Sequence, residues 1–119
     1  MTEALEKTKI ACKALDDKKG KDIKVIDIHE ISVLADYYVI ASGTNQNQVQ
    51  AMVDAVEEAL TKEGFEPKQV EGSRNSSWIL MDYGDVIINV FDEENRLFYD
   101  LERIWRDGMT MGLSEVLSD

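Results

Sequence analysis

The chain has 119 residues and a mass of 13.5 kDa, which fits one domain and leaves little room for a second. Hydrophobic residues make up 44% of it, and no apolar run approaches the roughly 20 residues that a membrane-spanning helix needs. The first residues also lack the basic and apolar regions of a secretory signal. A single cysteine and a single histidine exclude an internal disulfide and multi-histidine metal sites. We therefore expect a cytoplasmic protein.

The chain is strongly acidic. It carries 24 acidic against 13 basic residues, a formal net charge of -11, and the excess of acidic residues lies after residue 24. The negative electrostatic field of such a chain repels phosphate and anionic lipid. We therefore expect no direct, sequence-specific binding of nucleic acid and no membrane association. The same field favours a basic protein partner, with solubility alone as the plainer explanation of the same charge.

Three elements are expected in the first third of the chain. Residues 3–19 have the capping and charge pattern of a helix, which Gly20 ends. Residues 24–31 are rich in isoleucine and valine, as a strand would be. Residues 36–42 are almost continuously apolar, which indicates a strand buried on both faces.

A second helix has the clearest pattern. Its apolar side chains recur at helical spacing, at Val49, Met52, Val53, Val56, Ala59 and Leu60. Thr44 or Asn45 caps its start, and Gly64 supplies the left-handed residue at its end. A short strand over 65–70 would complete a β–α–β-like unit, whose strands we expect to run parallel.

The remaining chain predicts a hairpin and a third helix. Strands over 78–83 and 86–91 are joined by a turn, and a helix follows over 95–107. The expected fold class is α/β, a single domain over residues 1–119 with a mixed sheet of about five strands and flanking helices. Its core would span about residues 3–107, with a short C-terminal tail over 108–119.

The hairpin presents two unlike faces if its turn has two residues. One face is apolar, with Ile79, Met81, Tyr83, Val86, Ile88 and Val90. The other mixes aromatic, aliphatic and polar side chains: Trp78, Leu80, Asp82, Ile87, Asn89 and Phe91. Because unpartnered Asp and Asn are costly in a dry core, we expect the mixed face to meet solvent or a partner. The alternative is that a helix covers it and Asn89 is hydrogen-bonded there.

Catalytic motifs are scarce. Residues 42–44 could bind an anion at a helix N-terminus, although helix capping by Thr44 or Asn45 is the favoured explanation of the same residues. Asp82 and Asp85 could hold Mg²⁺, but turns favour aspartate at such positions anyway. Cys12 fits a packing role, and His29 fits an exposed or hydrogen-bonded side chain.

Several segments together resemble the ribosomal silencing factor family, also called Iojap-like. They are DYYVIASGT at 36–44, EG at 71–72, WILMDYGD at 78–85, VF at 90–91 and RLFYDLERIW at 96–105. The resemblance implies a fold related to nucleotidyltransferases that has lost the catalytic carboxylates. It also implies a factor that binds the large ribosomal subunit through its fourteenth ribosomal protein, blocks the small subunit and lowers translation during starvation. Many members carry histidine where this chain has Asn89, which keeps a polar group but cannot titrate.

The expected function is therefore non-enzymatic, with no cofactor and no metal. The residues expected to bind the partner are Trp78, Asp82, Tyr83, Asp85, Asn89, Phe91, Arg96 and Tyr99. Two alternatives remain open from the sequence. One is a metal-dependent nucleotidyltransferase that uses Asp82, Asp85 and residues 42–44. The other is a homodimeric adaptor that buries the aromatic face between two copies.

Overall fold

In the computed structural model, residues 3–30, 35–72, 78–93 and 109–111 are described. The elements run in the order α1 (Glu3–Asp17), β1 (Lys21–Asp27), β2 (Tyr37–Gly43), α2 (Gln46–Lys62), β3 (Gln69–Glu71), β4 (Trp78–Asp82), β5 (Val86–Asp92) and β6 (Met109–Met111). The helix expected over 95–107 lies outside the described residues. Within the described part of the chain, no helix is long and apolar enough to cross a membrane.

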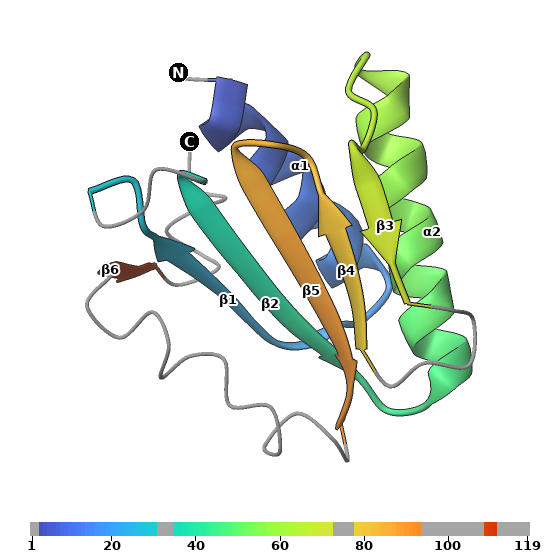
Figure 1. The fold of residues 1–119 in the computed structure, drawn as a ribbon. Coiled ribbons are helices and arrows are strands. Elements are labelled where there is room, and N and C mark those ends of the chain that lie inside the picture. The colour runs from blue at the N-terminus through green and yellow to red at the C-terminus, as the bar shows by residue number, and fades with distance from the viewer. Residues whose placement is uncertain (1–2, 31–34, 73–77, 94–108, 112–119) are drawn as a thin grey trace.

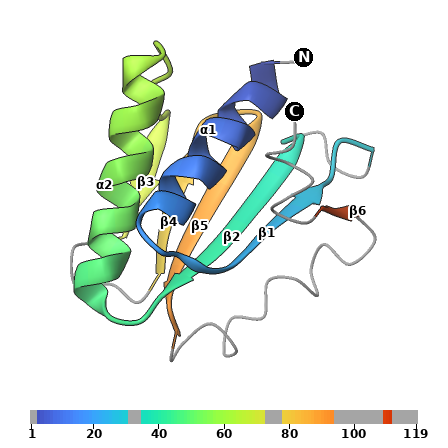
Figure 2. The same cartoon turned by 180° about the vertical axis from the view of Figure 1, so that it is seen from behind.

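The strands form one mixed sheet in the order β3-β4-β5-β2-β1-β6, and both helices lie on the same face of it (Figures 1 and 2). Neighbouring strands are antiparallel except β2 and β5, which run parallel. The expected α/β class and the expected five strands are confirmed. The sixth strand, β6, belongs to the segment expected as a tail, where three residues between two glycines give too short a pattern to predict a strand.

The parallel pair differs from the expected one. The strands that flank α2 are not neighbours, because β4 and β5 lie between β2 and β3. The short strand also begins later than expected, since Pro67 has no N–H to give to a ladder. Pairing begins with the amide of Lys68, which donates to the carbonyl of Asp82 at 2.7 Å.

The two helices cover the main core. In α1, the side chains of Ala4, Thr8, Ala11, Cys12 and Leu15 are buried at helical spacing. In α2, the expected apolar stripe is buried apart from Ala59, which is partly buried, and Asn45 caps the first turn by accepting from the amide of Gln48. Gly64 ends α2 with a φ of 89°, the left-handed geometry expected of it.

The opposite face of the sheet carries a second, smaller apolar cluster. Its buried members are Ile26, Ile28, Ala35, Tyr38, Ile40 and Phe91, with Trp78 and Ile87 packed against them. Because alternate residues of a strand point to opposite faces, β2 supplies Val39 to the main core and Tyr38 to this cluster. The expectation that β2 is buried on both faces is therefore confirmed.

Candidate functional site

The β4–β5 hairpin turns on two residues, Gly84 and Asp85. The amide of Tyr83 donates to the carbonyl of Val86 at 2.9 Å, and Gly84 has a φ of 88°, which favours glycine. A carboxylate oxygen of Asp82 accepts from the amide of Gly84 at 2.8 Å and supports the turn from within. This geometry confirms the predicted pairing and the predicted division of the hairpin into an apolar and a mixed face.

The polar groups of the mixed face bind each other. The side-chain oxygen of Asn89 accepts from the indole N–H of Trp78 at 2.9 Å and from the hydroxyl of Tyr38 at 3.4 Å, and its amide donates to the carbonyl of Val39 at 3.4 Å. The ring of Trp78 stacks on that of Phe91, with centroids 5.5 Å apart. The face is a packed cluster with its polar groups satisfied.

Three residues expected at the partner surface are buried instead. Asn89 is 0% exposed, Phe91 1% and Tyr83 3%. Hydrogen bonds satisfy Asn89, the apolar cluster includes Phe91, and Tyr83 packs in the main core, so none of the three side chains is open in this structure. Their part in binding a partner stays a prediction.

Trp78, Asp82 and Asp85 remain partly exposed. Arg96 and Tyr99, the other two residues expected to bind the partner, lie outside the described residues.

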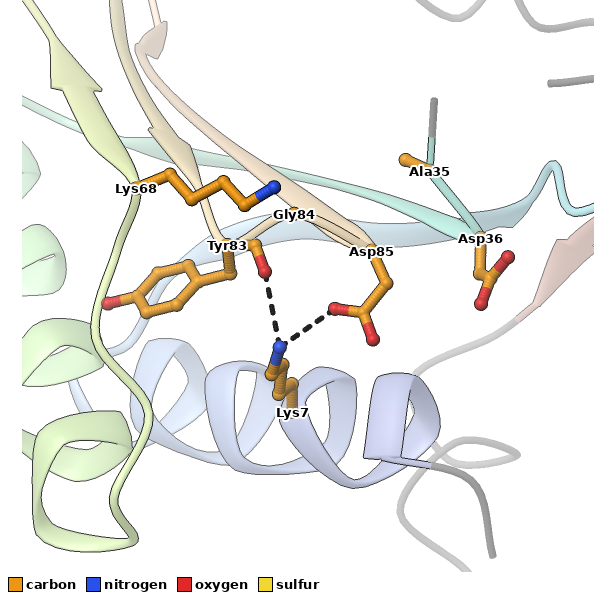
Figure 3. Close-up of a pocket in the computed structure, with 7 residues that line it drawn as sticks. All are labelled: Lys7, Ala35, Asp36, Lys68, Tyr83, Gly84 and Asp85. Atoms are coloured by element: carbon orange, nitrogen blue, oxygen red, sulfur yellow. Dashed lines mark hydrogen bonds and ion pairs between the residues drawn. The ribbon is translucent and has the colours of Figure 1, made fainter. Parts of the chain in front are cut away.

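The turn borders a shallow pocket of about 380 Å³ (Figure 3). The residues around it come from α1, from the segments before β2 and β3, and from the turn: Lys7, Ala35, Asp36, Lys68, Tyr83, Gly84 and Asp85. The ammonium of Lys7 lies 2.9 Å from a carboxylate oxygen of Asp85 and 3.1 Å from the carbonyl of Tyr83. Asp36 joins the turn through its amide, which donates to the carbonyl of Asp85 at 2.7 Å.

Lys7, Asp36 and Lys68 were not predicted from the sequence as residues of the site. Asp36 begins one of the segments that carry the family resemblance, so its motif was a usable signal. Lys7 carries no such signal in the sequence, because it lies 78 positions from Asp85 and resembles any other lysine of a helix. The pocket therefore brings together residues that only the tertiary structure shows as neighbours.

The groups considered for catalysis have structural partners. Asp82 accepts from the backbone of the turn, and Asp85 pairs with Lys7. The amide of Thr44, which could have held an anion, donates to the side chain of Gln48 at 2.6 Å. Among the described residues, no three histidine, cysteine or acidic side chains are grouped so as to hold a metal. These contacts lend no support to the nucleotidyltransferase alternative.

The remaining reactive side chains lie away from the pocket. Cys12 is fully buried in α1, and burial raises the pKa of its thiol to about 12, as suits a packing residue. His29 is exposed and its ring is hydrogen-bonded to Asp27, which raises the pKa of the imidazole. Both observations confirm the roles predicted from the sequence.

Comparison with known proteins decides the family. The model of the family described as "Ribosomal silencing factor during starvation" matches residues 1–119. The chain belongs to this family. It is 39% identical to ribosomal silencing factor RsfS of Bacillus subtilis over 99 residues, covering 83% of this chain and 84% of that one.

Two other relatives agree with this family. The chain is 35% identical to the RsfS of Halalkalibacterium halodurans over 113 residues, covering 95% and 97% of the two chains. A crystal structure of a protein from Chromobacterium violaceum superposes with a TM-score of 0.83 at 35% identity, covering 88% of each chain. The resemblance predicted from the motifs is therefore confirmed, and the chain is a ribosomal silencing factor, a regulator of translation.

Proposed function

We propose that this silencing factor binds the large ribosomal subunit in the cytoplasm and sterically prevents the small subunit from joining it. Translation would then fall under nutrient limitation, with no chemical step, cofactor or metal. The observation that carries the proposal is the match of the silencing-factor family model to the whole chain.

The proposed partner on the large subunit is a basic surface of its fourteenth ribosomal protein. The net charge of -11 supports such a partner, because opposite charge speeds the encounter of two proteins. Two carboxylates, Asp36 and Asp85, line the pocket at the β4–β5 turn beside two ammonium groups, Lys7 and Lys68, so the pocket itself carries no net charge. The attraction to a basic partner comes from the acidity of the chain as a whole. The partner would gain specificity from an aromatic anchor on the same hairpin, at the end of β4 that lies away from the turn.

Trp78 is the proposed anchor. It is partly exposed, and its indole is held in place by the hydrogen bond to Asn89 and by stacking on Phe91. A large side chain fixed before binding loses little entropy on docking, which is a property of interface hot spots. We therefore propose that Trp78, Asp82 and Asp85 contact the partner, whereas Tyr83, Asn89 and Phe91 support them from beneath. Arg96 and Tyr99, which lie outside the described residues, are proposed as a supporting group for the same partner.

The test is equilibrium binding of the purified chain to isolated large subunits. Trp78→Ala is expected to weaken binding by about 30-fold, the loss of about 2 kcal/mol typical of an interface anchor. Asp82→Asn is expected to slow association and to reduce its dependence on salt. Glu58→Gln removes the same charge from the exposed side of α2 and serves as the matched control. Undiminished binding by a folded Trp78→Ala protein would contradict the proposed patch.

A further inference from the structure

Lys7 connects the first helix to the turn of the β4–β5 hairpin. Its ammonium binds the carbonyl of Tyr83 at 3.1 Å and the carboxylate of Asp85 at 2.9 Å (Figure 3). These two residues flank Gly84, the position where the turn adopts a left-handed φ. One side chain therefore bridges the two residues on either side of the turn glycine.

The environment of Lys7 makes this contact specific. Its side chain is only 12% exposed, whereas that of Asp85 is 32% exposed. The ammonium also lies 5.2 Å from the centre of the Phe65 ring and 3.9 Å from a carboxylate oxygen of Glu3. A partly buried ammonium with a hydrogen-bonded carboxylate partner is held more firmly than an exposed ion pair.

The backbone of the turn is anchored separately. The carbonyl of Asp85 accepts from the amides of Asp36 and Tyr37, at 2.7 and 3.2 Å, which ties the turn to β2. These bonds leave the Asp85 side chain free to rotate. The contact that fixes its direction among the described residues is the one from Lys7, which lies below the turn on the helix side (Figure 3).

We propose that Lys7 is a positioning residue for the partner-binding surface. It holds Asp85 and the turn in the shape that the partner meets, and it is too buried to be a main contact itself. This inference rests on the proposed function, because it assumes that the turn is part of the surface that binds the large subunit. It adds a residue of α1 that neither the sequence motifs nor the family assignment identifies.

The experiment compares three lysine variants for binding to large subunits. Lys7→Met removes the charge at nearly constant volume and is expected to weaken binding by about tenfold. Lys7→Arg keeps a cation with several donors and is expected to restore binding to within about threefold of the original chain. Lys13→Met is the matched control, since Lys13 is on the same helix but 74% exposed, with only a loose pair to Asp17 at 3.8 Å.

The proposal would be contradicted if Lys7→Met changed binding only through the loss of one positive charge. Removing either lysine makes the chain more acidic by one charge, which would strengthen attraction to a basic partner equally in both variants. If Lys7 positions the turn, Lys7→Met should speed dissociation from the large subunit and Lys13→Met should not. Equal binding by the two variants would overturn the role of Lys7. Failure of the original chain to bind would overturn the proposed function itself.

Hydrogen exchange separates positioning from loss of the fold. In Lys7→Met, the amides of Tyr83 and of Asp36, which close the turn, are expected to exchange faster while those of α2 keep their protection. Uniformly faster exchange would show that Lys7 only stabilises the domain and would contradict positioning. If Lys7→Met does not fold, Lys7→Gln, which keeps an N–H donor without the charge, replaces it under the same criteria.

A double variant tests the route of the effect. If Lys7 acts through Asp85, then Lys7→Met with Asp85→Asn should bind no more weakly than Asp85→Asn alone. Losses that simply add would show that Lys7 does not act through this carboxylate.

Discussion

The indole N–H of Trp78 donates to the side-chain oxygen of Asn89 at 2.9 Å, between strands β4 and β5. Asn89 is fully buried, and Trp78 is partly exposed. A buried amide thus orients an aromatic ring at the border of the surface, which links the packing of the second cluster to the proposed interface.

Asn89→Ala should destabilise the fold. It removes the acceptor of the indole N–H of Trp78 and the donor to the carbonyl of Val39 at a buried site, where lost hydrogen bonds are costly. We expect the free energy of unfolding to fall by about 2 to 3 kcal/mol in urea denaturation. Val70→Ala, at a side chain that is 42% exposed, should change it by less than about 0.5 kcal/mol. Equal effects of the two substitutions would contradict the role of Asn89.

Removing the Tyr83 hydroxyl should not lower the free energy of unfolding, in contrast to the substitution of Asn89. This hydroxyl is buried with no hydrogen-bond partner among the described residues, and burial, with Glu57 and Glu66 nearby, raises its pKa to about 12. Tyr83→Phe therefore removes an unsatisfied group, and we expect it to be neutral or stabilising by up to about 1 kcal/mol. Tyr38→Phe removes a hydroxyl that is bonded to Asn89 and should destabilise. Thermal unfolding of the two variants checks the contrast, and a clear loss in Tyr83→Phe would show that its hydroxyl has a partner.

Much of this architecture was predictable because the signals are local. The stripe of α2, its Asn45 cap and its Gly64 end each depend on neighbours within a few positions. The two-residue turn alone was enough to assign each side chain of the hairpin to one of its two faces.

The burial of Phe91 and the location of β3 were not predictable in the same way. Both depend on which strands become neighbours, and the pairing of β5 with β2 joins residues about 50 positions apart in the chain. The ion pair of Lys7 with Asp85 escaped prediction for the same reason.

The Cys12 thiol should be unreactive in the folded protein. It is 0% exposed and burial raises its pKa to about 12, so almost no thiolate forms at neutral pH. A thiol reagent such as DTNB is expected to label it only after unfolding in urea. Rapid labelling of the native chain would contradict this environment.

His29 should make a small pH-dependent contribution to stability. The hydrogen bond with Asp27 raises the pKa of its imidazole above the ordinary value of 6.5. A raised folded-state pKa stabilises the fold below the unfolded pKa, and the contribution disappears as the pH rises through the folded pKa. We expect His29→Gln to lower the urea midpoint at about pH 5 and to leave it unchanged at about pH 9. An equal shift at both pH values would mean that the histidine acts without titrating.

The most direct test of the proposed function is a sucrose gradient of large and small subunits mixed with the chain. We expect the chain to migrate with free large subunits, to be absent from joined ribosomes, and to reduce the joined fraction as its concentration rises. A joined fraction that stays constant at saturating chain, or a chain that migrates with joined ribosomes, would contradict the proposed function.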